Sequence, residues 1–321
     1  MFGELLTAMV TPFDQNGTIA TDTIAKLSKK LVNDGNDGLV LAGTTGESPN
    51  LSKDDRLILY GTTIGSVGDS AKIIAGTGTY STTESIELSK HAQDAGVDGI
   101  MVVTPYYSKP SQEGIYQHFK SISENVDLPI IAYNIPGRTS KLIEIETLER
   151  IVNDTNVIAI KDAVNDINFT KKEIENLHQK NKLDVEIYSG DDKLTLDMMK
   201  LGAKGVISVA SHVIGKEIRS LIDSHIKGDK EISDEINNEL KNFYELIFAE
   251  PSPAPIKAIL NESFQYVGSC KLPLIDASPE LLTKLIDEYK NWRKINDYNG
   301  NKVSTIENEK ANNPRLKVKS P

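Results

Sequence analysis

Residues 129–161 read PIIAYNIPGRTSKLIEIETLERIVNDTNVIAIK, a stretch that opens and closes with an apolar run. The two runs begin at Pro129 and Val157, 28 residues apart. Each run is continuous in apolar residues rather than alternating with polar ones, which is typical of a parallel strand buried on both faces. Because amphipathic sequence lies between such runs, the stretch predicts a strand, a helix and a second parallel strand.

The same unit recurs along the first two thirds of the chain, with consecutive runs starting 20 to 34 residues apart. The six other runs begin at Leu5, Gly38, Lys72, Gly99, Val185 and Gly205. Eight strand–helix units with right-handed connections predict an α/β fold, a closed (β/α)8 TIM barrel. An open doubly wound sheet is the alternative, but no G-x-G-x-x-G fingerprint follows any run, which favours the barrel.

The apolar runs stop after about Gly228, and the chain then changes character. We expect residues 1–228 to form the barrel and residues 229–299 to form a small all-helical C-terminal domain. Helical spacing in that second part is shown by the apolar residues Ile236, Leu240, Phe243, Tyr244 and Ile247. Residues 300–321 are polar and lack periodicity, so they are expected to be a disordered tail.

Composition excludes several classes of protein. The 321 residues include 36 Lys and Arg against 46 Asp and Glu, a net charge of −10, which argues against nucleic-acid binding. The longest uncharged stretch, residues 57–68, is too short to cross a membrane, and the N-terminus lacks a secretory pattern. The single cysteine, Cys270, fits a reducing compartment. We therefore expect a cytoplasmic enzyme or binding protein with no nucleic-acid or membrane partner.

Catalytic side chains of such barrels lie at the C-terminal ends of the strands, where Lys161 ends the run beginning at Val157. Burial there would lower the pKa of the lysine, and a neutral amine attacks ketones to form a Schiff base. The structural alternative is a lysine whose stem lies along apolar surface with its amine in water. Strand and lysine alone favour that alternative.

Other strand ends carry groups that suit the same chemistry. The phenol of Tyr133 can move protons, and the glycine-flanked turn at Thr44 and Thr45 can hold a carboxylate. Arg138 can hold a second carboxylate through a bidentate pair. Each has a structural alternative. Tyr133 can be a packed ring, the turn at Thr44 and Thr45 an ordinary strand-to-helix turn, and Arg138 an arginine at the barrel rim. No histidines or cysteines stand at zinc-ligand spacing, so we expect no metal site, and His212, at another strand end, is assigned no role.

Taken together, six motifs resemble those of the dihydrodipicolinate synthases, a family of the N-acetylneuraminate lyase superfamily of pyruvate aldolases. The motifs are GTTGES (43–48), TPYY (104–107), YNIPGRT (133–139), IKDA (160–163), SGDD (189–192) and GVISV (205–209). They stand in the order and spacing of that family, and the resemblance covers residues 1–296. The stretch EPSPAPIK, at 250–257, resembles the family's C-terminal motif.

The resemblance implies a barrel with a helical domain, usually a homotetramer, that needs no cofactor. It implies a class I condensation of pyruvate with L-aspartate 4-semialdehyde to 4-hydroxy-tetrahydrodipicolinate, on the route to diaminopimelate and lysine. Lys161 resembles the Schiff-base lysine, and Tyr133 the proton-relaying tyrosine. Thr44 then links Tyr133 to Tyr107, which resembles the tyrosine that enters the neighbouring subunit's site.

The remaining site residues also follow from the resemblance. Thr45 resembles the residue that binds the pyruvate carboxylate, and Arg138 the one that holds the carboxylate of the aldehyde. Gly190 and Ile207 resemble backbone contacts that complete the pocket. Sialic-acid lyases and sugar-acid aldolases of the superfamily tend to lack the arginine, so Arg138 favours the semialdehyde. The alternatives are an N-acetylneuraminate or 2-keto-3-deoxy-sugar-acid lyase, and a non-catalytic barrel that binds a small acid.

The sequence departs from the family at the site where bacterial members bind lysine as an inhibitor. Lys53 and Arg56 stand where inhibited members usually carry histidines. Two added positive charges would repel the ammonium groups of lysine. We therefore expect feedback inhibition by lysine to be weak or absent.

Overall fold

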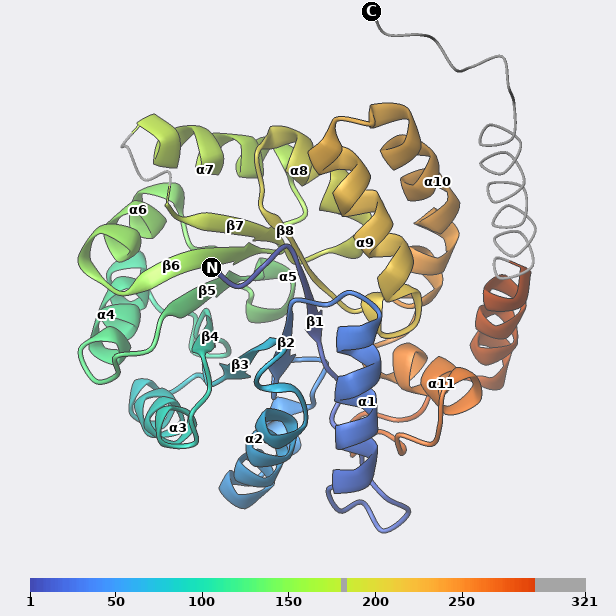
Figure 1. Ribbon diagram of the computed structural model, residues 1–321. Coiled ribbons are helices and arrows are strands. Elements are labelled where there is room, and N and C mark those ends of the chain that lie inside the picture. Colours follow the sequence, from blue (N-terminus) through green and yellow to red (C-terminus); the bar gives the residue numbers. More distant parts are fainter. Residues whose placement is uncertain (180–183, 292–321) are drawn as a thin grey trace, which may run out of the picture.

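A computed structural model describes residues 1–179 and 184–291 of the chain (Figure 1). Eight parallel strands form a closed barrel in which each strand pairs with the next along the chain and β8 pairs with β1, which confirms the predicted architecture. The predicted tail 300–321 and residues 292–299 lie outside the described residues. The strands are β1 (Leu5–Ala8), β2 (Gly38–Leu41), β3 (Lys72–Gly76), β4 (Gly99–Val103), β5 (Ile130–Asn134), β6 (Val157–Asp162), β7 (Glu186–Ser189) and β8 (Gly205–Ser208).

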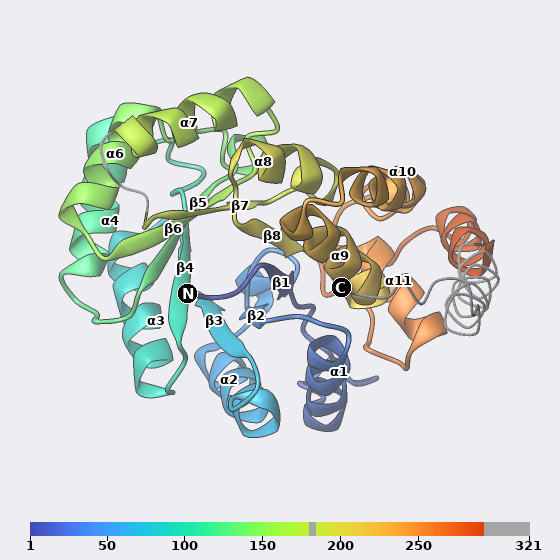
Figure 2. The same cartoon turned by 45° about the horizontal axis from the view of Figure 1, so that its top comes forward.

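Helices follow the strands and surround the barrel, as Figure 2 shows. They are α1 (Thr21–Asn33), α2 (Lys53–Val67), α3 (Thr82–Asp94), α4 (Gln112–Ser123), α5 (Pro136–Thr139), α6 (Ile145–Asp154), α7 (Ile167–Gln179), α8 (Thr195–Leu201) and α9 (Ser211–Lys227). Two single 3-10 turns, η1 (Ser48–Asn50) and η2 (Asp192–Leu194), follow β2 and β7. Since helices cover the outside and side chains fill the inside, every residue of β2 and β8 is buried. That double burial explains the continuous apolar runs.

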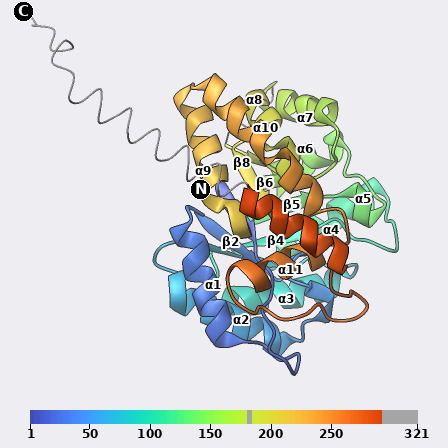
Figure 3. The same cartoon turned by 90° about the vertical axis from the view of Figure 1, so that its right-hand side faces the viewer.

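Two further helices, α10 (Lys230–Leu246) and α11 (Ala254–Ser263), and a helical segment at 279–291 follow the barrel (Figure 3). The predicted apolar stripe of α10 is buried at Leu240, Phe243 and Tyr244, and α10 packs on α9. The division at residue 228 stays a prediction. No helix within residues 1–179 and 184–291 is long and apolar enough to cross a membrane.

Register between neighbouring strands sets the heights of the side chains at the mouth of the barrel. Tyr133 of β5 is the direct partner of Lys161 in β6, and Lys161 is in turn the partner of Tyr188 in β7. Partners in adjacent parallel strands point to the same face. The pairing therefore brings the phenol and the amine together inside the barrel.

Candidate active site

Lys161 lies near the end of β6 with its side chain inside the barrel, where the residue is 4% exposed. Its Nζ lies 4.4 Å from the centroid of the Tyr133 ring. Burial lowers the pKa of the amine to about 8; the Asp192 carboxylate opposes the shift and the Arg138 guanidinium adds to it. At that pKa about one amine in ten is neutral at pH 7, against about one in three thousand for an ordinary lysine. The site therefore supplies a nucleophilic amine at neutral pH.

Gly190, just after β7, leaves the space that the lysine stem occupies. A Cβ added at Gly190 would lie 2.7 Å from the Cβ of Ala163 and 3.2 Å from Cε of Lys161. The N–H of Gly190 donates to the carbonyl of Asp162 at 2.7 Å. Because the N–H of Gly190 is already bonded, its carbonyl is the backbone group that can contact a ligand. Ile207, the other residue expected to offer backbone contacts, is buried in β8 opposite Leu6.

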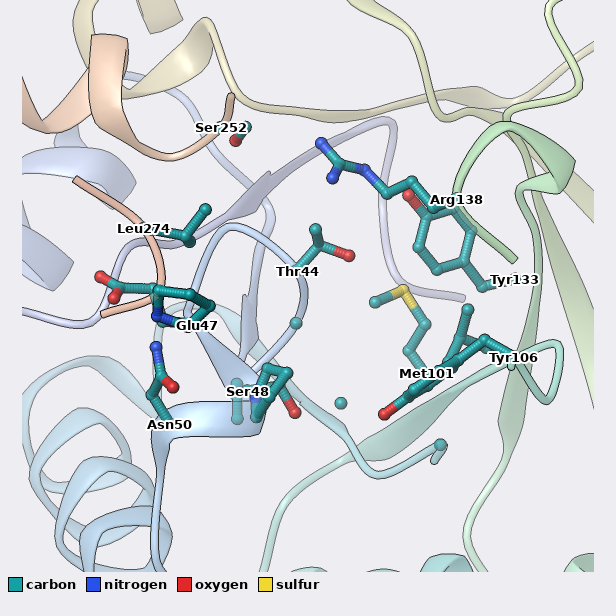
Figure 4. Close-up of a pocket in the computed structure, with 17 residues that line it drawn as sticks. Thr44, Glu47, Ser48, Asn50, Met101, Tyr106, Tyr133, Arg138, Ser252 and Leu274 are labelled. Atoms are coloured by element: carbon teal, nitrogen blue, oxygen red, sulfur yellow. The ribbon is translucent and has the colours of Figure 1, made fainter. Parts of the chain in front are cut away.

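Thr44, in the turn after β2, faces Tyr133 of β5 across the barrel mouth, and Figure 4 shows the Thr44 hydroxyl turned toward the tyrosine. Burial raises the pKa of Tyr133 to about 12, while the Arg138 charge and the Thr44 side chain oppose the shift. The phenol is therefore neutral at physiological pH and is a proton donor beside the amine.

The turn that carries Thr44 and Thr45 is closed by its own backbone. The N–H of Glu47 donates to the carbonyl of Thr44 at 3.1 Å, and that of Ser48 donates to Gly43 at 3.2 Å. Thr45 is 3% exposed, whereas Thr44 is half-buried and lines the 310 Å³ cavity. That this turn holds a carboxylate stays a prediction.

Arg138 projects from α5, the single helical turn after β5, and its residue is exposed. It borders two cavities. One, of about 310 Å³, is also lined by Thr44, Tyr106 and Tyr133 (Figure 4). The other, of about 390 Å³, is also lined by Gly190. A guanidinium that borders both cavities and acts on the pKa of Lys161 suits an anionic second reactant.

Tyr107 lies apart from the buried side chains of the predicted site. Its residue is 91% exposed and its backbone is left-handed, with φ of 68°. Its neighbour Tyr106 turns inward instead, lines the 310 Å³ cavity and packs edge-on against Tyr80 at 5.7 Å. A phenol directed outward in this way is available to another subunit.

Asp192 is a member of the site that sequence reasoning missed, because in the sequence it is only the second of two carboxylates that follow an apolar run. The residue is 2% exposed. Its carboxylate accepts hydrogen bonds from the hydroxyl of Ser208 and from the backbone N–H groups of Val209 and Ala210, at 3.0 and 3.1 Å. Burial raises its pKa to about 6. Only the folded barrel brings β7 and β8 close enough to show this environment.

Replacing Asp192 is expected to change the pH dependence of the amine. The Asp192 carboxylate raises the pKa of Lys161, so Asp192→Asn should move it below about 8. The rate of imine formation with pyruvate, followed from pH 6 to 10, should then reach half its plateau at a lower pH than in the unmodified protein. Asp191→Asn is the matched control and should leave the midpoint in place. A midpoint that rises in Asp192→Asn would contradict the assignment.

His212 has a structural explanation. Its Nε2 accepts the backbone N–H of Val10 at 3.0 Å, so the ring proton is on Nδ1 and is donated to the carbonyl of Val209 at 2.8 Å. Burial lowers the pKa of the ring to about 4, which keeps it neutral. The residue ties the end of β8 to the chain after β1. Within residues 1–179 and 184–291, no group of three or more His, Cys, Asp or Glu side chains is placed to hold a metal ion.

Known proteins share both the sequence and this fold. Residues 1–291 match the model of the Dihydrodipicolinate synthetase family. The chain is 45% identical to 4-hydroxy-tetrahydrodipicolinate synthase of Desulforamulus reducens over 291 residues, which are 90% of this chain and 96% of the relative. It is 43% identical to the synthase of the same name from Heliobacterium modesticaldum, over 90% of this chain and 96% of that one.

Solved structures of dihydrodipicolinate synthases are also similar to this chain in fold and sequence. The crystal structure of dihydrodipicolinate synthase DapA-2 from Bacillus anthracis is similar with a TM-score of 0.87 and 42% identity, covering 90% of this chain and 98% of that one. The synthase from Cyanidioschyzon merolae, solved with lysine bound, has a TM-score of 0.87 and 35% identity, covering 91% and 98% of the two chains.

Proposed function

Because this chain belongs to the dihydrodipicolinate synthetase family, we propose that it condenses pyruvate with L-aspartate 4-semialdehyde to 4-hydroxy-tetrahydrodipicolinate. The enzyme is a lyase of the class I aldolase type, acting in the biosynthesis of diaminopimelate and lysine. The observation that carries the proposal is the buried amine of Lys161, with the Tyr133 phenol beside it and the hydroxyl of Thr44 turned toward that phenol. The lone cysteine of the chain, Cys270, supports a cytoplasmic location.

In the first half of the proposed reaction, the neutral amine of Lys161 attacks the keto carbon of pyruvate. A carbon–nitrogen bond forms, and loss of the former keto oxygen as water leaves an imine. Tyr133, neutral and 4.4 Å from the amine by its ring centroid, donates the proton that the departing hydroxyl takes. Thr45 and the amides of its turn hold the pyruvate carboxylate, and the carbonyl of Gly190 and the backbone of Ile207 complete the pocket.

In the second half, a proton leaves the methyl group of the imine, and the resulting enamine attacks the aldehyde carbon. Arg138 holds the carboxylate of the aldehyde through a bidentate pair, at the border of the two cavities. Thr44 passes protons between Tyr133 and the Tyr107 of a neighbouring subunit. Ring closure by the amino group of the substrate then releases the product from Lys161.

The proposal includes a homotetramer, because the Tyr107 side chain is exposed and lies apart from the other site residues of its own chain. Exposed apolar side chains stand next to residues that line the 310 Å³ cavity: Tyr80 contacts Tyr106, and Leu272 and Ile275 flank Pro273 and Leu274. A second copy covering this end of the barrel would bury them and bring its own Tyr107 to Thr44.

Separate assays with the candidate substrates test the proposed function. The protein is given pyruvate with L-aspartate 4-semialdehyde in one assay, and N-acetylneuraminate or a 2-keto-3-deoxy-sugar acid in another. Because the guanidinium of Arg138 fits a carboxylate, we expect the semialdehyde to be turned over faster than the sugar acids. Faster cleavage of the sugar acids would replace the proposal by the lyase alternative. Tight binding of pyruvate without turnover of any aldehyde would leave a binding protein.

Inhibition by lysine is expected to be weak or absent. Arg56 donates to the carbonyl of Ser48 at 2.9 Å and to its hydroxyl at 2.8 Å, while Lys53 pairs with Glu87 at 3.0 Å. The resemblance also places Ser48 in the lysine site of inhibited family members, and here its hydroxyl already has a cationic partner. Millimolar lysine should therefore leave the initial rate nearly unchanged. A rate halved by millimolar lysine would contradict this, and Arg56→His should raise the sensitivity if Arg56 is the cause.

A further inference from the structure

A buried ion pair joins the turn that carries Thr44 to the C-terminal part of the chain. Nζ of Lys257, in α11, lies 2.6 Å from Oε1 of Glu47, and both side chains are essentially inaccessible to solvent. Figure 4 shows Glu47 turned away from Thr44, beside the C-terminal segment that carries Leu274. The pair connects residues 210 positions apart in the sequence, so it fastens the catalytic turn to a segment outside the barrel strands.

Both members of the pair have further partners that fix their geometry. The other carboxylate oxygen of Glu47 accepts the backbone N–H of Lys271 at 2.7 Å. The ammonium of Lys257 donates to the carbonyl of Ser269 at 3.1 Å and lies 4.3 Å from the centroid of the Phe13 ring. A buried charge pair contributes little net stability over apolar residues of the same volume, but its directed contacts hold one geometry.

The turn itself needs such support, because its backbone is strained. Ala42 and Glu47 have φ of 50° and 56°, in the left-handed region that residues with a Cβ rarely adopt. Between them, Gly46 is so close to the preceding chain that an added Cβ would lie 3.0 Å from the amide nitrogen of Ala42. Strained backbone conformations persist only where many surrounding contacts hold them, and they are common at functional sites.

We propose that Lys257 is a positioning residue: through Glu47 it holds the 43–48 turn in the conformation that places the Thr44 hydroxyl against Tyr133. The inference rests on the proposed function, because it gives that hydroxyl a part in proton transfer. The simpler alternative is that the pair only attaches α11 to the barrel. The two roles predict different results when the pair is removed from a protein that still folds. Only the positioning role predicts a looser 43–48 turn and a lower kcat.

The test removes both charges together, since a lone buried charge would destabilise the whole protein. Glu47→Gln/Lys257→Met is the variant, and its glutamine keeps an acceptor for the backbone N–H of Lys271. The matched control is Asp37→Asn/Arg219→Met, which removes a 2.6 Å pair from the opposite end of the barrel. Each protein is assayed as the full chain, with its thermal midpoint measured alongside.

Hydrogen exchange gives the readout that does not depend on activity. Amides in 43–48 should exchange faster in the Glu47→Gln/Lys257→Met variant, with peptides from the barrel strands unchanged, and the control should leave 43–48 protected. Unchanged exchange across 43–48 in a folded variant would overturn the proposal. This readout stands even if no imine forms on Lys161, an outcome that would remove the proposed function instead.

A mutant cycle with Thr44→Val separates positioning from general damage. In the unmodified background, removing the pair should lower kcat by about tenfold or more, because a misplaced group loses catalysis steeply. In the Thr44→Val background the same change should have no further effect on kcat, while the thermal midpoint shifts equally in both. An equal fall in kcat in both backgrounds would show that the pair acts through stability and not through Thr44.

Discussion

Sodium borohydride added with pyruvate should trap a reduced adduct on Lys161 and on no other lysine. The reason is the burial of this amine, which lowers its pKa to about 8 and leaves it nucleophilic at a pH where exposed lysines are protonated. Digestion and mass analysis of the peptides locate the adduct. Lys161→Ala should abolish trapping and lower turnover by about a thousandfold or more, since the covalent route is lost.

The control for this experiment is Lys204→Ala. Lys204 precedes β8 at the other end of the barrel and pairs with Glu4 at 2.9 Å, which raises its pKa. It should remain protonated, so trapping and turnover should be unchanged without it. An adduct that persists in Lys161→Ala, or none on the folded unmodified protein, would remove the Schiff-base mechanism.

Arg138→Ala should separate the two substrates. We expect kcat/KM for L-aspartate 4-semialdehyde to fall by about a hundredfold or more, because a charged, bidentate partner of the carboxylate is lost. Formation of the pyruvate imine should be nearly unaffected. The Arg138 charge lowers the pKa of Lys161, so each protein is compared at the pH where its own imine formation reaches a plateau.

Arg138→Lys tests whether the fork of the guanidinium matters or only its charge. Lysine keeps the charge but not the two parallel N–H donors, so it should restore only part of the lost kcat/KM. Equal damage to imine formation and to use of the semialdehyde in Arg138→Ala would show that the arginine supports the fold of the mouth and does not select the substrate.

The fold followed from the sequence almost residue by residue at the strands. The run beginning at Gly38 became β2 and the run beginning at Val157 became β6, because burial on both faces leaves an uninterrupted apolar signature. Placement of Lys161 at the barrel mouth followed from its position at a strand end. Its contact with Tyr133 required the register of β5 against β6, which no local pattern encodes.

The parts of the site that escaped prediction are made by contacts between distant segments. The buried state of Asp192 depends on amides at the end of β8, and the burial of Glu47 depends on Lys257, far along the chain. In the sequence both carboxylates look like ordinary polar residues after a strand. Only the completed tertiary structure removes them from water and gives each its partners.

The link between Glu47 and Lys257 also sets an order of events during protein synthesis. The ribosome adds all eight strands before it adds Lys257, so a barrel that closes on the nascent chain does so while Glu47 still lacks its cation. Until α11 packs, Glu47 lacks its cation and the strained turn lacks that support. A barrel that closes during synthesis would thus complete its scaffold first and its catalytic geometry last, when the final helices fold onto it.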